Sequence, residues 1–524
     1  MLLSRQRLLA VVGIAAALAL SACSDNGSPS SSSSGSQGSQ TPVAGGNLVI
    51  DTLTPPVDFN TNATVDNESI WILEQVAQPL YSNGRDGKSL TPTLATGYTV
   101  SSNHTVWTFT LRPGVKFSNG APLTAKDVVF SLNAARNPKN VFSFVDSAIA
   151  SVSAPDDSTV VVKTKYPWAP LLADVAFVGN AIVPANYGGQ TAAAFYNHPI
   201  GTGPFKFDKY VKGQYVKLVR NPDYWQPGRP YLDSVTFDAI ANGNTRVSQL
   251  ESGQAQVIES APYSLISSLK SAGFNTGLYP STRIDYVTMN EKVKQLADVH
   301  VRRAISEAVD RAALMKAVFF GQGTVADSPF MPAVTYYTAN AGVLPFNLAQ
   351  AKQELAKSAY PHGGFSIDFI AAAGDQVQST VAQIIQQDLK PLNISVKIRS
   401  LDPSQVTAQE QSFHFGMRET LWTMDIVDPD EYAGFSFDGS AGSFSNFTHY
   451  NNPKVNQLIE SAEKTFSSSK RASLYAQVQK RLAADAPMVW LGESPYNYPH
   501  TSKLQGFYVF PEGYEDLQDA RLSK

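Results

Sequence analysis

Residues 107–133 read WTFTLRPGVKFSNGAPLTAKDVVFSLN. Polar and apolar residues alternate through residues 105–111, which predicts a half-buried strand that stops at a turn over residues 112–114. Thr124 then stands three residues before Asp127, and this capping-box spacing predicts an amphipathic helix through Arg136. A strand, a turn and a capped helix within 32 residues are typical of an α/β protein.

The same alternation of element types continues on both sides of this stretch. Apolar residues at helical spacing predict helices over residues 67–77, 299–319, 348–357, 376–390, 453–466 and 470–484. Strands are predicted over residues 47–53, 204–207, 214–219, 231–240, 365–371, 395–400, 413–422 and 488–491. We therefore predict α/β layers around mixed or mostly parallel sheets. Because the sequence shows no long linker after residue 46, we expect discontinuous lobes that share crossing strands.

The N-terminus has the features of a secretory signal. Arg5 and Arg7 precede an apolar run, and small residues come directly before Cys23, which is the single cysteine of the chain. Its position resembles the lipobox of bacterial lipoproteins, in which this thiol is lipidated; a plain signal peptide with an incidental cysteine is the alternative. We expect residues 1–22 to be the signal peptide, Cys23 to carry the lipid, and the Ser- and Gly-rich residues 23–45 to be a flexible tether.

The body after the tether is long enough for two or three domain-sized units, and 43% hydrophobic residues can supply their cores. It has no second apolar stretch of membrane-spanning length. The formal net charge is −3 and no basic block occurs, which argues against nucleic acid as a partner.

Motifs for catalysis are missing from the sequence. It contains no Gly-x-Ser-x-Gly elbow, phosphate-binding Gly-Lys loop or His-Glu-x-x-His, and its seven histidines are scattered. Asp428 and Asp430 flank Pro429, which fits either a metal-binding acidic pair or, as we prefer, an ordinary turn. We expect no enzyme activity, no cofactor and no metal.

Several segments together resemble the extracytoplasmic solute-binding proteins of family 5, which serve peptide and nickel ABC importers. Residues 107–133 are nearly the family signature. Further matches, in the family's order, are residues 201–205, 220–225, 298–305, 309–311, 450–453 and 485–487.

The resemblance implies a two-lobed fold of the periplasmic-binding-protein type (class II, cluster C) with an extra domain inserted in the first lobe. The first lobe would comprise residues 46–82, 197–283 and 489–524, the inserted domain residues 83–196, and the second lobe residues 284–488.

The resemblance also implies where a ligand binds. In peptide-binding relatives, an aspartate three residues after a tryptophan pairs with the α-amino group of the ligand, and Asp425 stands in that position after Trp422. The intervening backbone, Thr423 and Met424, would hydrogen-bond the peptide. Arg418 on the same predicted strand would meet a ligand carboxylate. The alternatives are a surface turn for Asp425, core packing for Trp422 and an exposed arginine at residue 418.

The expected function is that of a receptor anchored by lipid to the extracytoplasmic face of the cell membrane. We expect a monomer that captures an oligopeptide or dipeptide between two lobes and delivers it to an ABC permease with ATPase subunits. Two alternatives stay open, a non-peptide solute such as a nickel chelate or an oligosaccharide, and a regulatory lipoprotein that has lost transport. Peptide binders often have glycine where Leu421 stands, so the sequence departs from the peptide-binding pattern at this position.

Overall fold

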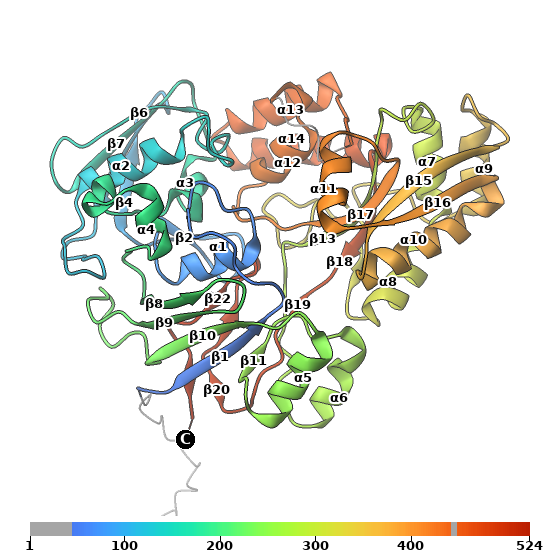
Figure 1. Ribbon diagram of the computed structural model, residues 1–524. Coiled ribbons are helices and arrows are strands. Elements are labelled where there is room, and N and C mark those ends of the chain that lie inside the picture. The colour runs from blue at the N-terminus through green and yellow to red at the C-terminus, as the bar shows by residue number, and fades with distance from the viewer. Residues whose placement is uncertain (1–43, 442–447, 524) are drawn as a thin grey trace, which may run out of the picture. The chain divides into compact units, whose positions relative to one another are not determined.

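A five-stranded sheet lies at the base of the computed structural model, which describes residues 44–441 and 448–523 (Figure 1). Its order is β11 (Val257–Ile258), β1 (Asn47–Thr52), β10 (Ser234–Ala239), β9 (Tyr215–Arg220) and β8 (Phe205–Val211). β1 is parallel to β10 and β11, whereas β8, β9 and β10 are antiparallel neighbours, and β8 and β9 fall on the strands predicted over residues 204–207 and 214–219.

The two faces of β1 bury different neighbours. Val49 packs with α5 (Gly243–Ser252) and α6 (Ile266–Ser271), while Leu48 and Ile50 enter the core that holds α1 (Asn67–Glu74). This alternation follows from the two-residue period of a strand.

Residues 107–133 fold as predicted, into a strand, a turn and a capped helix. β5 (Val106–Leu111) joins β4 (Ala95–Val100), β7 (Thr159–Thr164) and β6 (Ile149–Ser153) in an antiparallel sheet of order β4-β5-β7-β6. α2 (Ala125–Ala135) packs on this sheet, and Asp127 Oδ2 accepts from the backbone N–H of Thr124 at 2.8 Å, as the capping box requires. The neighbouring short elements are β2 (Tyr81–Asn83), β3 (Leu90–Pro92), α3 (Leu171–Asp174), η1 (Val178–Asn180), η2 (Ala185–Gly189) and α4 (Ala192–Asn197).

A six-stranded mixed sheet organises the later part of the chain. Its order is β14 (Thr324–Val325), β18 (Met488–Glu493), β13 (Ile284–Met289), β17 (Met417–Trp422), β15 (Phe365–Ala372) and β16 (Ile394–Leu401). Its helices are α7 (Val299–Ala308), α8 (Arg311–Phe319), α9 (Leu348–Ala356), α10 (Gln376–Asp388), η4 (Lys390–Leu392) and α11 (Pro403–Gln411). The prediction of one helix over residues 299–319 is wrong, because Asp310 interrupts it and caps a second helix by accepting from Ala313 N at 3.0 Å.

The chain crosses between the sheets more than once. After α12 (Asp430–Phe437), η5 (Gly439–Ala441), α13 (Pro453–Glu463) and α14 (Ser468–Asp485), β18 enters the six-stranded sheet. Residues 496–522 then return to the core of the five-stranded sheet. They form three short two-stranded ladders: β12 (Leu278–Tyr279) with β19 (Tyr496–Asn497), β20 (Leu504–Gln505) with β23 (Arg521–Leu522), and β21 (Tyr508–Val509) with β22 (Glu515–Asp516). η3 (Tyr263–Leu265) precedes α6. The crossings agree with discontinuous lobes, but the lobe boundaries stay a prediction.

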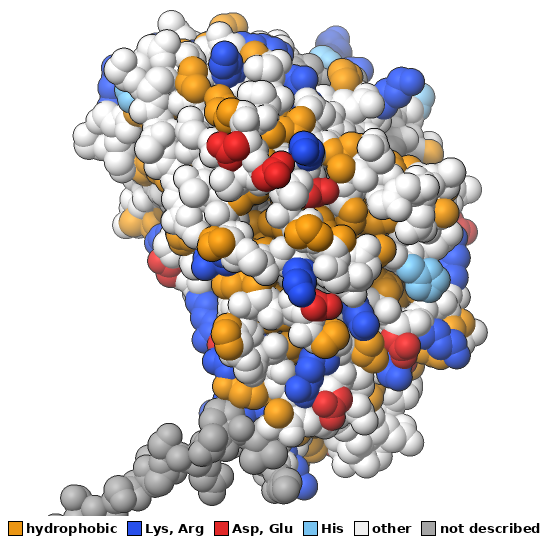
Figure 2. Space-filling model, turned by 90° about the vertical axis from the view of Figure 1, so that its left-hand side faces the viewer, with side chains coloured by type: hydrophobic (Ala, Val, Ile, Leu, Met, Phe, Trp, Pro, Cys, Tyr) orange, Lys and Arg blue, Asp and Glu red, His pale blue; other side chains and the backbone are white. Residues whose placement is uncertain are grey.

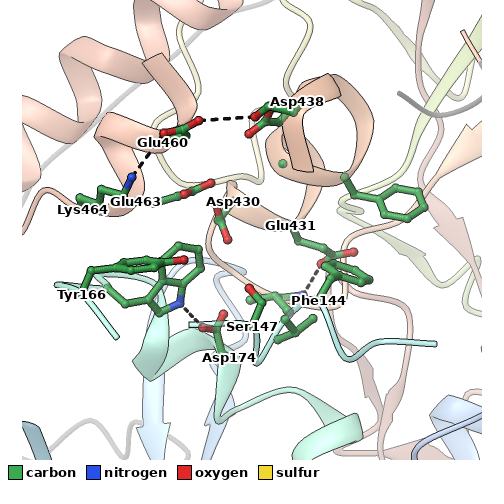
Figure 3. Close-up of a pocket in the computed structure, with 16 residues that line it drawn as sticks. Phe144, Ser147, Tyr166, Asp174, Asp430, Glu431, Asp438, Glu460, Glu463 and Lys464 are labelled. Carbon is green, nitrogen blue, oxygen red and sulfur yellow. Dashed lines mark hydrogen bonds and ion pairs between the residues drawn. The ribbon is translucent and has the colours of Figure 1, made fainter. Parts of the chain in front are cut away.

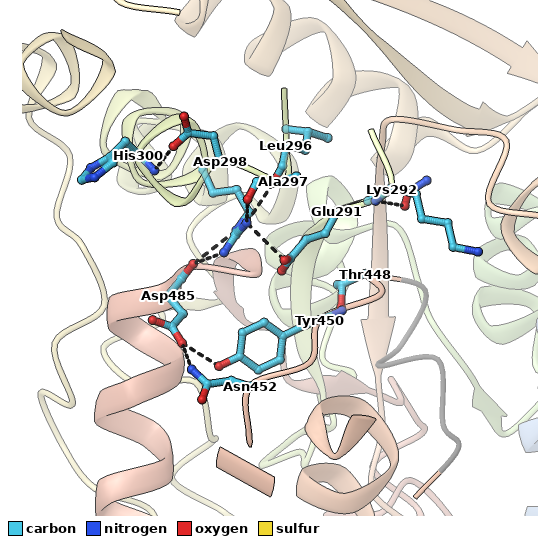
Figure 4. Close-up of polar contacts among 12 residues, drawn as sticks. Glu291, Lys292, Leu296, Ala297, Asp298, His300, Thr448, Tyr450, Asn452 and Asp485 are labelled. Atoms are coloured by element: carbon cyan, nitrogen blue, oxygen red, sulfur yellow. Dashed lines mark hydrogen bonds and ion pairs between the residues drawn. The ribbon is translucent and has the colours of Figure 1, made fainter. Parts of the chain in front are cut away.

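Several of the family-like motifs meet in one buried network (Figure 4). Arg302, 4% exposed, donates from Nε and Nη2 to the backbone oxygen of Asp485 at 3.2 and 3.0 Å and pairs with Glu291 at 3.2 Å. The Asp485 carboxylate in turn accepts from Tyr450 Oη and Asn452 Nδ2, both at 2.7 Å. These motif residues hold α7, α14 and the segment before α13 together, so their role here is structural.

Charged side chains of both signs are interspersed on the face shown in Figure 2. Among the residues described, no helix has both the length and the apolar character needed to cross a bilayer.

Candidate functional site

The loop between β17 and α12 is held in place by contacts from three other segments. Thr282 Oγ1 is 3.1 Å from both the backbone nitrogen and the backbone oxygen of Met424, and Asn83 Nδ2 donates to the backbone oxygen of Asp425 at 3.1 Å. Glu431, at the start of α12, accepts from the backbone N–H groups of Asp425 and Ile426, both at 2.9 Å. The position of Asp425 is therefore fixed by its backbone.

The Asp425 side chain is half-buried, and no hydrogen bond or ion pair to its carboxylate is present among residues 44–441 and 448–523. Burial raises its pKa to about 7. Glu74, Glu431 and Glu512 lie within electrostatic range of it, and we call these four residues the Asp425 cluster.

Glu512 is the most isolated member of the Asp425 cluster. It is 2% exposed, and neither carboxylate oxygen has a hydrogen-bond partner within the part of the chain that the structure describes. Burial, with a further contribution from the charge of Asp425, raises its pKa to about 8. A buried carboxyl group without a partner is costly, and carboxyl groups with strongly shifted pKa values cluster at functional sites.

A row of aromatic rings runs from the end of β17 toward residues 142–145. The Trp422 ring lies 4.9 Å from that of Phe435, which is 5.5 Å from that of Phe144. Trp422 Nε1 is buried and has no hydrogen-bond partner in the described residues. The rings thus link Trp422 to a pocket that Phe435 and Phe144 help to line.

This pocket has a volume of about 550 Å³ and two walls from distant parts of the sequence (Figure 3). One wall comes from residues 144–174, with Tyr166 and Trp168, and the other from residues 426–464. Six acidic residues line it: Asp174, Asp430, Glu431, Asp438, Glu460 and Glu463. Lys464 is its single basic lining residue and lies 3.3 Å from Glu460.

The acids of the pocket influence one another electrostatically. Burial, followed by the charges of Glu463 and Asp428 and then that of Asp174 on the opposite wall, raises the pKa of Asp430 well above its usual range. Burial raises the pKa of Glu463 to about 7. Asp174 has its own donor, Trp168 Nε1 at 2.6 Å.

The two walls touch beside the pocket. The backbone N–H of Ala169 donates to the backbone oxygen of Glu463 at 2.7 Å, and the rings of His104 and Phe466 stack at 4.0 Å. The pocket is therefore bounded on that side by direct contacts between residues 104–169 and the end of α13.

The predicted ligand residues lie next to the pocket and not among its lining side chains. Met424 is fully buried, and Thr282 lies within hydrogen-bonding distance of both of its backbone groups. Thr423 is half-buried. Arg418, whose side chain is 17% exposed, pairs with Glu410 on α11. Ligand contact by these residues stays a prediction, and Cys23 lies outside the described residues.

Sequence reasoning missed the pocket acids. The prediction of a turn at residues 428–430 fits Asp428, whose Oδ1 accepts from the backbone N–H of Asp430 at 3.1 Å and whose carboxylate pairs with Arg471 at 2.6 and 2.8 Å. Asp430 lines the pocket instead. The available signal was the density of acids in residues 425–438, which does not reveal where each side chain points.

Comparison with known proteins identifies the class of fold. A family model for bacterial extracellular solute-binding proteins, family 5 (middle part), matches residues 89–444. The glutathione-binding protein GsiB of Pectobacterium atrosepticum is 28% identical over 485 residues, covering 90% of this chain and 92% of that protein.

Two solved structures are similar over nearly the whole chain. The periplasmic binding protein DppA of Helicobacter pylori, in complex with the peptide STSA, has a TM-score of 0.82 at 25% identity and covers 92% of this chain and 99% of its own. The oligopeptide-binding protein AppA of Bacillus subtilis, in complex with a nonapeptide, has a TM-score of 0.81 at 26% identity and covers 92% and 100%.

Proposed function

Because this chain belongs to the bacterial extracellular solute-binding proteins of family 5, we propose that it is the solute-capturing receptor of an ABC importer and that its solute is a short peptide. One observation carries the choice of a peptide: the Asp425 carboxylate is half-buried at the end of β17 and has no partner among the described residues. A peptide brings a matching group, its α-ammonium.

The chemistry of this pair is favourable. An ammonium and a carboxylate form a short charge-assisted hydrogen bond, and the bond gains strength when closing walls exclude water. Desolvating both charges offsets part of this gain, so the site needs good complementarity. Trp422 would provide an apolar wall for the bound peptide.

In the proposed mechanism, the bound ligand shifts the equilibrium between an open and a closed arrangement of the protein. A ligand favours a closed arrangement only if it binds that arrangement more tightly than an open one. The pocket has one wall from the proposed inserted domain, residues 83–196, and one from the proposed second lobe, residues 284–488. A peptide that touches both walls has that differential affinity, and the closed receptor would then dock on the permease and its ATPase subunits.

We further propose that the protein acts as a monomer on the extracytoplasmic face of the membrane, held there by lipid on Cys23, and that it catalyses no reaction. The support for the anchor is the sequence of residues 1–45. A tether raises the effective concentration of the receptor near its importer without new contacts.

Native mass spectrometry of the purified protein tests the function by identifying the solute that it retains. A retained peptide supports the proposal, and a retained chelate or sugar refutes the choice of solute. If no solute is retained and a broad peptide and sugar library gives no thermal shift, the protein is a non-transporting regulator.

Calorimetry tests the role of Asp425. The Asp425→Asn variant should bind a free-amine peptide about tenfold to a hundredfold more weakly, as expected for a hydrogen bond to a charged group. Its affinity for the N-acetylated peptide should stay near that of the wild type. Asp368→Asn, which removes a carboxylate that is 43% exposed and paired with Arg399, is the control for net charge. Equal affinity of the wild type and Asp425→Asn for the free amine would exclude amine pairing.

A further inference from the structure

The pocket beside Asp425 has more carboxyl groups than cationic side chains to pair with them. Of its six acidic lining residues, four have partners of their own. Asp174 accepts from Trp168 Nε1, Glu431 from two backbone N–H groups, Asp438 from Ser440, and Glu460 pairs with Lys464. Asp430 and Glu463 remain; their carboxyl groups hydrogen-bond each other, and no cationic side chain among the described residues lies within ion-pairing distance of either.

Asp430 and Glu463 point to the same space. A methyl group at Gly434 would lie 3.8 Å from Asp430 Oδ1 and 4.0 Å from Glu463 Oε1, so both oxygens face the region beside this glycine. Asp430 Oδ1 is shut off from solvent and has no hydrogen-bond partner in the described residues. In Figure 3 the Asp430 side chain points toward the middle of the pocket, between the wall with Tyr166 and the wall with Glu431.

A second, independent observation extends this unpaired charge to the Asp425 side of the pocket. Glu431 lines the pocket and also belongs to the Asp425 cluster, in which Glu512 is 2% exposed with both oxygens unpartnered among the described residues. Hydrogen-bond partners are present for the great majority of buried polar atoms, so the orphan oxygens of Glu512 and Asp430, on the two sides of Glu431, point to a hydrogen-bond donor supplied from outside.

The aromatic wall of the pocket suits a cation as well. Tyr166, Trp168, Phe144 and Phe435 present ring surfaces, and the Lys464 ammonium already lies 5.3 Å from the centre of the Tyr166 ring. Aromatic faces attract ammonium and guanidinium groups, most strongly where water is excluded.

We propose that this pocket binds a lysine or arginine side chain of the peptide, with Asp430 and Glu463 as the residues that select its positive charge. The inference rests on the proposed function, since the α-ammonium at Asp425 supplies the first positive charge and the pocket the site for a second. An acidic side chain would add like charge to the pocket. An apolar one would leave the hydrogen-bonded pair of Asp430 and Glu463 without a cation.

Calorimetry with matched peptides tests the proposal. Trialanine is the parent, and lysine or norleucine replaces alanine at each of its three positions, because norleucine keeps the apolar stem of lysine without its charge. At one position or more, the lysine peptide should bind roughly tenfold to a hundredfold more tightly than its norleucine partner. Asp430→Asn and Glu463→Gln should each bring this ratio close to one while the affinity for the norleucine peptide stays within about threefold.

A buried carboxylate elsewhere in the chain provides the control. Glu259, 5% exposed, accepts from Leu53 N at 2.8 Å and does not line the pocket, so Glu259→Gln should keep the lysine preference. Equal binding of lysine and norleucine peptides at every position overturns the pocket proposal and leaves the proposed function standing. If none of the peptides binds, the proposed function itself fails. Binding of the norleucine peptide by each variant shows that the variant is folded.

Discussion

Replacing Glu512 by Gln should stabilise the ligand-free protein, and the gain should grow with pH. Burial raises the pKa of Glu512 from an ordinary 4.5 to about 8, so below pH 4.5 the carboxyl group is neutral whether the chain is folded or unfolded. As the pH rises, the unfolded chain loses this proton first, and folding then requires either keeping the proton or burying the charge. The raised pKa therefore lowers the free energy of unfolding as the pH rises from 4.5 through 8.

The size of the effect follows from the shift. At about 1.36 kcal/mol per pKa unit, the penalty is about 1 kcal/mol at pH 5, about 3 kcal/mol at pH 7 and about 4 kcal/mol at pH 8. Gln removes the charge and costs little else, because neither oxygen of Glu512 has a partner among the described residues. With about 2.1 cal/mol/K of unfolding entropy per residue, a chain of 524 residues shifts its Tm by about 1 °C per kcal/mol.

Differential scanning calorimetry of protein freed of solute by unfolding and refolding measures this effect. The Tm of Glu512→Gln minus that of the wild type should rise by about 3 °C between pH 5 and pH 8. Asp368→Asn changes the net charge equally but at an exposed position, and it controls for the charge alone. A difference between Glu512→Gln and wild type that is constant across this pH range would refute the reasoning, because it would mean that the Glu512 carboxyl group ionises as easily folded as unfolded.

Four further predictions concern the site and its anchor. Because burial raises the pKa of Asp425 and of Glu463 to about 7, a lysine peptide should bind more tightly at pH 8 than at pH 6 and release protons, seen as a buffer-dependent heat; pH-independent affinity would contradict this. Arg471→Met should destabilise the protein by about 3–5 kcal/mol, measured as a lower Tm, because it leaves the buried Asp428 charge unpaired; an unchanged Tm would contradict it. Asp430→Asn should raise the Tm of the ligand-free protein more at pH 8 than at pH 5, because burial, followed by the charges of Glu463 and Asp428, raises the pKa of Asp430 well above its usual range and makes its ionised form costly in the folded state; a Tm difference that does not change with pH would contradict this. Cys23→Ala should move the protein from the membrane to the soluble fraction at unchanged peptide affinity, and retention at the membrane would exclude the lipid anchor.

Local patterns predicted the elements well where the signal lies within one turn or one strand. The capping box at Thr124 and Asp127 placed the start of α2, and alternation placed β5. Asp310 is an N-cap residue of the same kind, and it begins α8. The apolar residues on both sides of it keep helical spacing, so the pattern predicted one continuous helix, which is wrong. The spacing of apolar residues indicates which face of a helix is buried, but it does not indicate where one helix ends and the next begins.

The pocket could not be predicted from the sequence, because its parts meet only through the tertiary fold. Asp430 and Glu463 lie on different helices, and the opposite wall comes from residues 144–174. Glu512 lies in no recognisable sequence motif. Its burial and its lack of a hydrogen-bond partner among the described residues depend on the residues that pack around it in the fold. The resemblance implies a ligand contact at Asp425, whereas the proposed charge preference of the pocket depends on neighbours that no local sequence pattern connects.

Selectivity for charge and control of closure follow from the same carboxylates. Burial raises the pKa of Asp430, and the charges of Glu463, Asp428 and, on the opposite wall, Asp174 add to the rise, so bringing the walls together without a ligand costs repulsion or the uptake of protons. A cation between the walls replaces this repulsion by attraction, and the sign change supplies the differential affinity that closure requires. A neutral solute of the same shape leaves the repulsion in place. A lower stability of the empty protein above the ordinary pKa of an aspartate, caused by buried Asp430, is therefore expected if the proposed site closes on positive charge.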